Sequence, residues 1–419
     1  MISLIEALNF RCLRYVRQPM GEFHVLVGPN GSGKTTFLDV VAFLSDLVSK
    51  GLDEAVGERT KDFRDLAWGR TESRFELAVE ATIPEDRRQR LAVKTYDTVR
   101  YEIAIGLNPE TSVVEILAES GWLKTAPPAA SSKQKTMFPS PDNPPGSILT
   151  GQRLKGGRSL FAKVPHGNDN YYADAHERDG RWAPSFKLGP RKSTLANLPE
   201  DEENFPVSSW FKQLLSNGVE QIILNSLLIR KASPPGQARG FKPDGSNLPW
   251  VVAALEHAKS PKLNEWVSHV RTALPDLESV RTVERPDDKH RYLVLVYRGG
   301  LEVPSWMASD GTLRLLALTL PAYLEDFRGI YLIEEPENGI HPRAVETMNQ
   351  SLSSVYDAQI LLATHSPVIL SIVKPEDVLC FAKTDEGATD IVSGDKHPRL
   401  RDWRGEENLG VLFAGGVLG

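Results

Sequence analysis

A glycine-rich run at residues 28–36 has the residue types and the spacing that hold a chain of phosphates. It matches the pattern G-x-x-x-x-G-K-S/T at every fixed position and reads Gly28-Pro29-Asn30-Gly31-Ser32-Gly33-Lys34-Thr35-Thr36. In such a loop the backbone N–H groups point inward at a helix N-terminus, where anions are stabilised. We therefore expect the run to bind a nucleotide, with Lys34 reaching the β- and γ-phosphates and the Thr35 hydroxyl binding Mg²⁺.

Two carboxylates follow a second apolar run, and they are of the type that holds a divalent cation and activates water. Glu334 and Glu335 come directly after residues 330–333, which are apolar and indicate a buried parallel strand. Parallel sheets bind their ligands at the C-terminal edge of the strands. We assign Glu334 to Mg²⁺, directly or through water, and Glu335 to orienting or deprotonating the attacking water.

A histidine follows the next apolar run along the chain. Residues 359–363 indicate another buried strand, and Thr364-His365-Ser366-Pro367 comes directly after it. Because this strand comes one strand after the acid pair, we expect His365 to lie at the same sheet edge and to donate to the γ-phosphate. The alternative is a histidine with a purely structural role at a strand end.

The segments around these residues have the patterns needed to position them. Residues 24–27 indicate a short buried strand before the glycine loop. Apolar residues recur at helical spacing over residues 34–50, which Gly51 follows. A strand, a glycine loop and a helix in this order are the context that a phosphate-binding loop requires. Pro342 suits the first turn of a helix between the two later strands.

Further elements follow from alternation and from turn residues. Residues 3–10 indicate a strand, and three later β-rich stretches are expected to pair antiparallel beside the strand that precedes the glycine loop: 75–83, 91–105 and 112–117. The expected helical segments are 207–228, 248–274 (two helices, divided at Pro261) and 313–324, and a hairpin over Gly299-Gly300 joins strands 292–296 and 301–303.

Composition places the chain among folded proteins and excludes some classes of function. The sequence is 41% hydrophobic and 25% charged, as expected of a folded protein. Its length of 419 residues allows two to three domain-sized units. The formal charge of −6 gives no overall basic character, and two cysteines are too few for a disulfide framework or a zinc knuckle. No apolar run has the length of a membrane span, and we expect a cytoplasmic protein without membrane contact.

The middle of the chain is locally basic. Residues 122–195 carry twelve Lys or Arg against five Asp or Glu, and aromatic residues are interleaved with them. Basic groups with aromatics are typical of nucleic-acid binding, with Arg153, Lys155 and Arg158 as the expected phosphate contacts. The alternative is a solvated insertion whose aromatic residues form a small core.

In their order along the chain, the motifs resemble the RecF/SMC/OLD-like branch of the ABC ATPases, often called AAA family ATPases. The matching stretches are Asn9-Phe10-Arg11, the glycine loop, Ser309-Asp310-Gly311-Thr312, Glu334-Glu335-Pro336-Glu337-Asn338-Gly339-Ile340-His341-Pro342 and Thr364-His365-Ser366-Pro367. The chain departs from the family pattern where Glu334 replaces the usual aspartate and where Asp310-Gly311 replaces two glycines. A Q-loop glutamine cannot be placed.

The resemblance implies a fold, its cofactors and a dimer. The fold is an α/β, ABC-type P-loop NTPase with a mixed central sheet, an antiparallel β lobe and a helical subdomain, without a long coiled coil. ATP and Mg²⁺ are sandwiched between the glycine loop of one subunit and the signature Ser309, Asp310 and Gly311 of the other. Arg11 is expected near the nucleotide, and a solvated arginine at a strand end is the alternative.

We divide the chain into four parts. Residues 1–121 and 291–419 are the two parts of the ATPase domain, 122–204 a basic, loop-rich insertion and 205–290 a helical subdomain. The apolar, glycine-rich residues 408–419 are expected to form a docking tail or to pack on the sheet edge.

These features predict an ATP hydrolase that forms a homodimer or a higher homo-oligomer. The leading interpretation is that ATP-driven dimerisation controls a separate effector, above all a nuclease, in antiphage defence, by analogy with two-gene systems. One alternative is a RecF-like repair ATPase that acts directly on DNA. Another is an ATP-gated scaffold that hydrolyses ATP very slowly.

Overall fold

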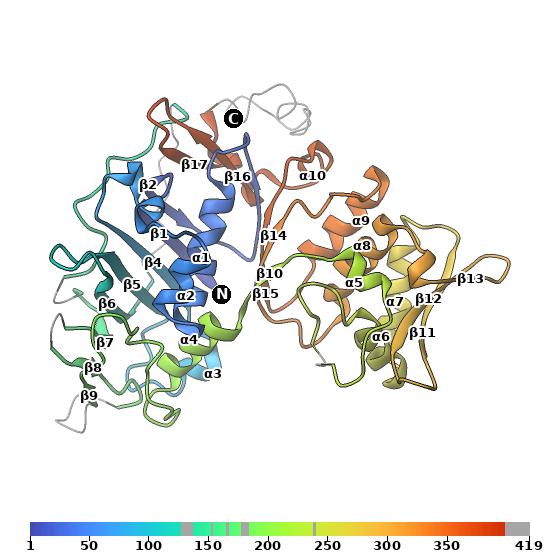
Figure 1. The fold of residues 1–419 in the computed structure, drawn as a ribbon, viewed down its shortest axis with the longest axis horizontal. Helices are drawn as coiled ribbons and strands as arrows, with labels where there is room; N and C mark the ends of the chain where they lie inside the picture. Colours follow the sequence, from blue (N-terminus) through green and yellow to red (C-terminus); the bar gives the residue numbers. More distant parts are fainter. Residues whose placement is uncertain (127–136, 152–153, 165–166, 177–183, 238–239, 399–419) are drawn as a thin grey trace.

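One helix lies between two β-sheets and organises the N-terminal half of the fold. The computed structural model describes residues 1–126, 137–151, 154–164, 167–176, 184–237 and 240–398. Helix α1 (Lys34–Ser49) follows the glycine loop (Figure 1), and 11 of its 16 residues are buried. Because its apolar side chains face almost every direction, α1 needs a cover on both sides.

The first cover is an eight-stranded antiparallel sheet in the order β2-β1-β4-β5-β6-β7-β8-β9. Ile5, Leu77 and Ile103 of this sheet share one hydrophobic core with Phe43 and Leu44 of α1. The strands are β1 (Ile2–Phe10), β2 (Leu13–Pro19), β4 (Arg74–Thr82), β5 (Thr98–Leu107), β6 (Val114–Lys124), β7 (Arg158–Ala162), β8 (Asp169–Tyr171) and β9 (Ser185–Phe186).

The second cover is a six-stranded mixed sheet in the order β10-β14-β15-β3-β16-β17. Its first five strands are parallel to one another, and β17 is antiparallel to β16. Leu332 and Leu361 face the core of α1, whereas Ile333 and Leu362 face a second core. The strands are β3 (Phe23–Val27), β10 (Val219–Ile222), β14 (Gly329–Glu334), β15 (Ala358–Ala363), β16 (Val378–Lys383) and β17 (Thr389–Ser393).

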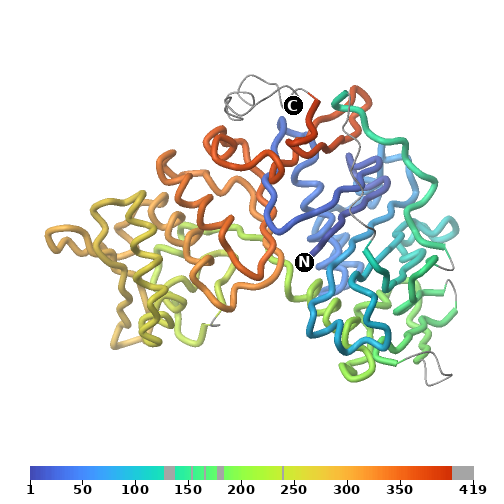
Figure 2. Tube along the Cα trace, turned by 180° about the vertical axis from the view of Figure 1, so that it is seen from behind, coloured from blue at the N-terminus to red at the C-terminus, as the bar shows by residue number. Residues whose placement is uncertain are grey.

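The second core belongs to a helical lobe on the far face of the six-stranded sheet. Figures 1 and 2 show its yellow and orange segments projecting to one side of the molecule, away from the antiparallel sheet. Trp266 is fully buried there, and its indole N–H donates to the Thr319 hydroxyl at 2.9 Å. The lobe contains α5 (Ser226–Arg230), α6 (Leu248–His257), α7 (Pro261–Val270), α8 (Asp310–Thr319), α9 (Pro342–Ser353) and a three-stranded antiparallel sheet of β11 (Leu277–Glu284), β12 (Arg291–Tyr297) and β13 (Leu301–Pro304).

Four shorter or peripheral helices complete the fold. α2 (Leu52–Gly57) and α4 (Pro206–Asn217) pack against α1, and α3 (Glu85–Arg88) packs against α4. α10 (Pro367–Leu370) follows the histidine loop and packs against α9. Within the residues that the structure describes, no helix combines the length and the apolar character that crossing a bilayer would need.

The predicted α/β fold with an antiparallel lobe is confirmed. The strands of that lobe, however, pair with a different strand from the one predicted. β4, β5 and β6 pair antiparallel as predicted, yet they join β1 and not the strand before the glycine loop, which lies in the other sheet. The prediction that these strands lie beside β3 was wrong, because β3 lies on the opposite side of α1 from β1.

Two other segments also differ from their predictions. The helix expected over residues 207–228 ends at Asn217, and β10 then adds a parallel edge strand beside β14. The supposed insertion at 122–204 carries β7 to β9, which extend the antiparallel sheet. Phe161 and Tyr171 from this segment are fully buried, which favours the interpretation of a small aromatic core. Residues 408–419 lie outside the described residues.

Candidate functional site

The main candidate site is a cavity at the C-terminal edge of the six-stranded sheet. It has a volume of about 310 Å³ and lies where β3, β14, β15 and β16 end. Most of the residues predicted from the sequence line it, together with Cys12, Ala363 and Lys383: Asn30, Gly31, Ser32, Gly33, Lys34, Thr35, Thr36, Glu334, Glu335 and His365. Segments more than 300 residues apart in the sequence therefore meet at one edge.

The glycines of the loop are required by the close approach of the β16–β17 hairpin. Gly28 and Gly33 have φ angles of 151° and 106°. A Cβ atom at Gly28 would lie 2.3 Å from the Phe381 carbonyl oxygen, and one at Gly33 would lie 2.4 Å from Thr389 Oγ1. Any larger side chain would push the hairpin away from the loop.

The first turn of α1 is open to an anion. Gly33 is the N-cap residue, and no side chain caps the backbone N–H groups there. The Lys34 ammonium donates to the carbonyls of Gly28 at 2.8 Å and Pro29 at 3.1 Å, which places it across the loop. Burial lowers the pKa of Lys34 to about 8, although Glu335 and Glu334 act in the opposite direction. The cavity thus combines a helix N-terminus with a lysine.

The donor set beside the loop fits Mg²⁺. The Thr35 hydroxyl donates to Glu334 Oε2 at 2.6 Å, so one hydroxyl and one carboxylate meet at the mouth of the cavity. Mg²⁺ binds through one or two protein oxygens, with phosphate oxygens and water completing its shell. Among the described residues, no group of three or more His, Cys, Asp or Glu side chains is arranged to hold a metal. These residues therefore suit a cation that arrives with phosphates.

The second carboxylate is held in a strained backbone position. Glu335 has a φ angle of 46°, in the left-handed region that few non-glycine residues adopt. Its backbone N–H donates to the Ala363 carbonyl at 2.8 Å, and the Asn338 side chain donates to Glu335 Oε2 at 2.6 Å. Strain of this kind clusters at functional sites. The sequence contains Asn338, but its positioning role could not be predicted.

His365 faces the same carboxylate across the cavity. Its Nε2 lies 4.0 Å from Glu335 Oε1. Burial, followed by the nearby charge of Lys34, lowers the pKa of His365 below its usual value. This shift favours the neutral ring, which can donate one N–H. Glu337 fixes the preceding backbone, because it accepts from the Thr364 hydroxyl at 2.5 Å and from the His365 N–H at 3.2 Å.

The predicted signature residues and Arg11 do not line this cavity. Ser309 caps α8 by accepting from the Thr312 N–H at 3.1 Å, and Asp310 pairs with Arg230 at 2.6 Å. A Cβ atom at Gly311 would lie 2.4 Å from the Gly339 carbonyl oxygen. Arg11 pairs with Asp39 of α1 at 3.2 Å. The structure thus brings the glycine loop, the acid pair and His365 together, and places the signature on the helical lobe.

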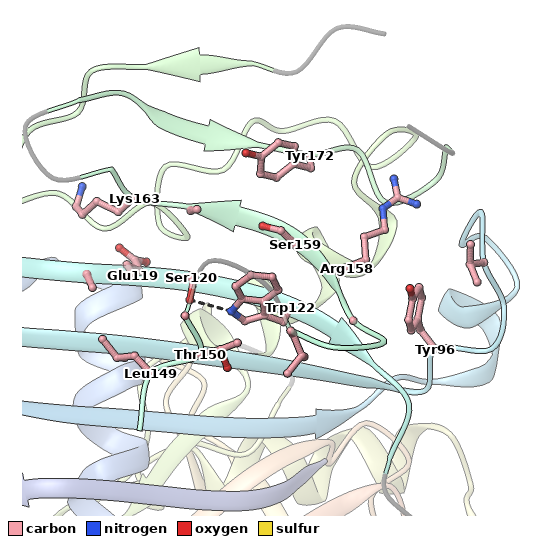
Figure 3. Close-up of a pocket in the computed structure, with 16 residues that line it drawn as sticks. Tyr96, Glu119, Ser120, Trp122, Leu149, Thr150, Arg158, Ser159, Lys163 and Tyr172 are labelled. Carbon is pink, nitrogen blue, oxygen red and sulfur yellow. Dashed lines mark hydrogen bonds between the residues drawn. The ribbon is translucent and has the colours of Figure 1, made fainter. Parts of the chain in front are cut away.

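A second cavity, of about 720 Å³, lies in the locally basic segment (Figure 3). Figure 3 shows Trp122 and Tyr172 beside it. The Arg158 guanidinium donates to the carbonyls of Ala173 and His176 and is therefore not the open phosphate contact that was predicted. Lys163 forms a buried ion pair with Asp169 at 2.8 Å. Lys155 is exposed, and Arg153 lies outside the described residues, so nucleic-acid binding by this segment stays a prediction.

The fold and the main site define a class of protein. A glycine loop between a parallel strand and a helix, with an acid pair at the end of a strand two positions away in the same sheet, is the arrangement of a P-loop NTPase. A solved SMC head bound to the C-terminal winged-helix domain of ScpA has a TM-score of 0.52 at 14% identity, over 93% of this chain and 97% of that one. An SMC head from Pyrococcus furiosus gives a TM-score of 0.48 at 13% identity, over 93% and 95% of the two chains.

The chain belongs to the family described as "AAA domain, putative AbiEii toxin, Type IV TA system", whose model matches residues 23–371. It also matches the OLD nuclease of Thermus scotoductus, with 44% identity over 41 residues. That match spans 10% of this chain and 8% of the nuclease. The resemblance inferred from the motifs is confirmed at this level: the chain is an AAA ATPase of this family, and its fold is like that of an SMC head.

Alkylation of Cys12 reports directly on the candidate cavity. Cys12 lines it, whereas Cys380, the other of the two cysteines, is fully buried with its pKa raised to about 12 by burial. We expect Mg²⁺ with ATP to slow maleimide labelling of Cys12 about 100-fold at a nucleotide concentration of about 100 times Kd, because bound ligand covers the thiol. Mass spectrometry of the labelled protein measures the rate.

Two variants control this experiment. Cys12→Ser should abolish labelling of the folded protein, and Lys34→Ala should retain labelling but lose the protection by ATP. Equal labelling rates with and without saturating nucleotide would contradict the assignment of this cavity.

Proposed function

We propose that this chain binds ATP with Mg²⁺ in the cavity at the sheet edge and hydrolyses it. The observation that carries the proposal is the position of the acid pair at the end of β14, with Glu334 bonded to Thr35 and Glu335 facing His365. A site that only bound nucleotide would need no second carboxylate there. Membership of the AAA family described above supports the same activity.

Each group then has a role that its surroundings support. Lys34, Thr35 and the N–H groups of the loop hold the phosphates, and Thr35 with Glu334 holds Mg²⁺, which supplies positive charge to the phosphate oxygens. Glu335 orients the attacking water and accepts its proton, and Asn338 keeps that carboxylate in place. Neutral His365 donates its N–H toward the γ-phosphate.

The signature residues are proposed to complete the site of a second copy of the chain. Ser309 and Asp310 are exposed at the N-terminus of α8 and do not line the cavity of their own chain. Large apolar side chains are exposed beside them: Leu227 is 71% exposed, Trp306 51% and Met307 70%. Burying such a patch against another copy is favourable. A head-to-tail dimer that forms on ATP therefore joins the glycine loop of one copy to the signature of the other.

The dimer is proposed to control a separate effector in antiphage defence, with a nuclease as the leading candidate. The family description names a toxin of a toxin–antitoxin system, and the partial match is to an OLD nuclease. Both support a role in defence. The effector would be switched on or off as the ATP-bound dimer forms and dissociates.

Replacing Glu335 by glutamine tests the catalytic assignment. Glu335→Gln should retain ATP binding and slow hydrolysis by roughly 10²-fold or more, because the amide cannot accept a proton from water. Phosphate release and equilibrium ATP binding measure the two properties. Glu54→Gln, an exposed change on α2, should behave as the wild type. Normal turnover by Glu335→Gln, combined with stalled turnover by Glu334→Gln, would show that the two acids have the opposite roles.

Ser309→Arg tests the composite site. Each monomer should still bind ATP, whereas the bulky side chain should block the dimer and lower ATPase activity to the level of an isolated monomer. Light scattering with ATP measures the mass, and phosphate release measures the activity. Ser353→Arg, at the exposed end of α9, should change neither. Full activity and an ATP-dependent dimer in Ser309→Arg would rule out the proposed sandwich.

A further inference from the structure

A second lysine lines the cavity on the side opposite the acid pair. In the sheet, β14 and β15 lie on one side of β3, and β16 lies on the other. Glu334 ends β14, His365 follows β15, and Lys383 ends β16. All three side chains line the same cavity as the glycine loop. The loop is therefore bordered by carboxylates and a histidine on one side and by a lysine on the other.

The position of Lys383 is fixed relative to the glycine loop. β16 pairs in parallel with β3, with Cys380 opposite Val27, so Lys383 lies beyond the end of β3, beside the loop. Its partner on β17 is Thr389, whose hydroxyl donates to the Ser32 carbonyl at 2.9 Å and whose N–H donates to the Cys12 carbonyl at 3.0 Å. Gly28 and Gly33 pack closely against the same hairpin, so the loop and the hairpin form one continuous part of the cavity wall.

No contact among the described residues explains why a lysine stands at position 383. Its side chain is exposed at the end of β16, and within the described residues no carboxylate pairs with it. The fold alone would accept any polar residue at this end of β16. A positive charge on the wall of a cavity that already has an open helix N-terminus and Lys34 is suited to an anion with several charges.

We propose that Lys383 binds the α-phosphate of the nucleotide. The proposal rests on the proposed function, because it takes a nucleotide as the ligand of the cavity. Thr35, Glu334, Glu335 and His365 mark the end of the cavity where the γ-phosphate lies. The phosphate chain must then extend toward the β16 side. Lys383 acts there on a group that ATP and ADP share, whereas His365 acts on one that only ATP has.

In this assignment, Lys383 raises the affinity for nucleotide but does not distinguish ATP from ADP. It should stabilise the diphosphate and the triphosphate equally and should not sense hydrolysis. The β16–β17 hairpin would then keep the product bound after phosphate leaves. Release of ADP, and with it the duration of the hydrolysed state, would depend on this contact.

The test compares Lys383→Met with its parent protein by calorimetric titration of Mg²⁺–ATP and of Mg²⁺–ADP. Both proteins carry Glu335→Gln, which slows hydrolysis during the titration. We expect Kd to rise about ten-fold for both nucleotides, since one charge-assisted hydrogen bond is lost. Lys383→Arg should restore most of the affinity. Lys374→Met removes an exposed lysine that precedes the opposite end of β16 and should leave both Kd values unchanged.

Each other outcome decides against the proposal. A loss confined to ATP would place Lys383 at the γ-phosphate, and unchanged Kd values for both nucleotides would exclude a phosphate contact. Either result leaves the proposed ATPase function standing if Lys34→Ala still abolishes binding. If the parent protein binds neither nucleotide at millimolar concentration, the proposed function fails and this assignment fails with it. A circular dichroism spectrum like that of the parent shows that Lys383→Met is folded.

Discussion

The burial of α1 is the constraint on which the site depends. Each fully buried Phe, Leu or Val side chain stabilises the fold by about 1.5–3 kcal/mol relative to exposure. α1 buries such residues on almost every face, so an eight-stranded sheet covers one side and parallel strands cover the other. Its N-terminus consequently opens at the edge where β3, β14, β15 and β16 end. The glycine loop, the acid pair and His365 meet because the same packing places all four strand ends there.

Packing at this edge also strains the backbone at one residue and brings charged side chains close together. A sheet edge with only a structural role would need neither. Glu335 adopts a left-handed backbone conformation, which costs on the order of 1–3 kcal/mol for a residue with a side chain. Contacts with Ala363 and Asn338 hold it there. Lys34 is buried close to two glutamates, and burial, followed by the charge of Lys34, lowers the pKa of His365. A bound polyphosphate with a divalent cation would balance these charges, which links the fold to the proposed chemistry.

The sequence predicted those parts of the fold and site that are local in the chain. The glycine loop with its strand and helix, the acid pair after β14 and the start of α9 at Pro342 are encoded by neighbouring residues. Other features depend on contacts across the whole chain. The bond between Thr389 and Ser32 joins residues 357 positions apart, and no periodicity indicates that Lys383 lies beside the loop. The wrong pairing predicted for β4 to β6 has a related reason, since alternation indicates a strand but not which strand pairs with it. β10 was taken for helix because an edge strand of four residues is too short for a clear pattern.

The central claim is that the chain hydrolyses ATP in this cavity with the help of a divalent cation. The most direct measurement is steady-state phosphate release by the purified wild-type chain, with Mg²⁺ and again with excess chelator, beside Lys34→Ala as the background. The structure leads us to expect release that saturates with ATP, requires Mg²⁺ and disappears in Lys34→Ala. Release that is insensitive to the chelator, or equal in the wild type and Lys34→Ala, would contradict this account of the site.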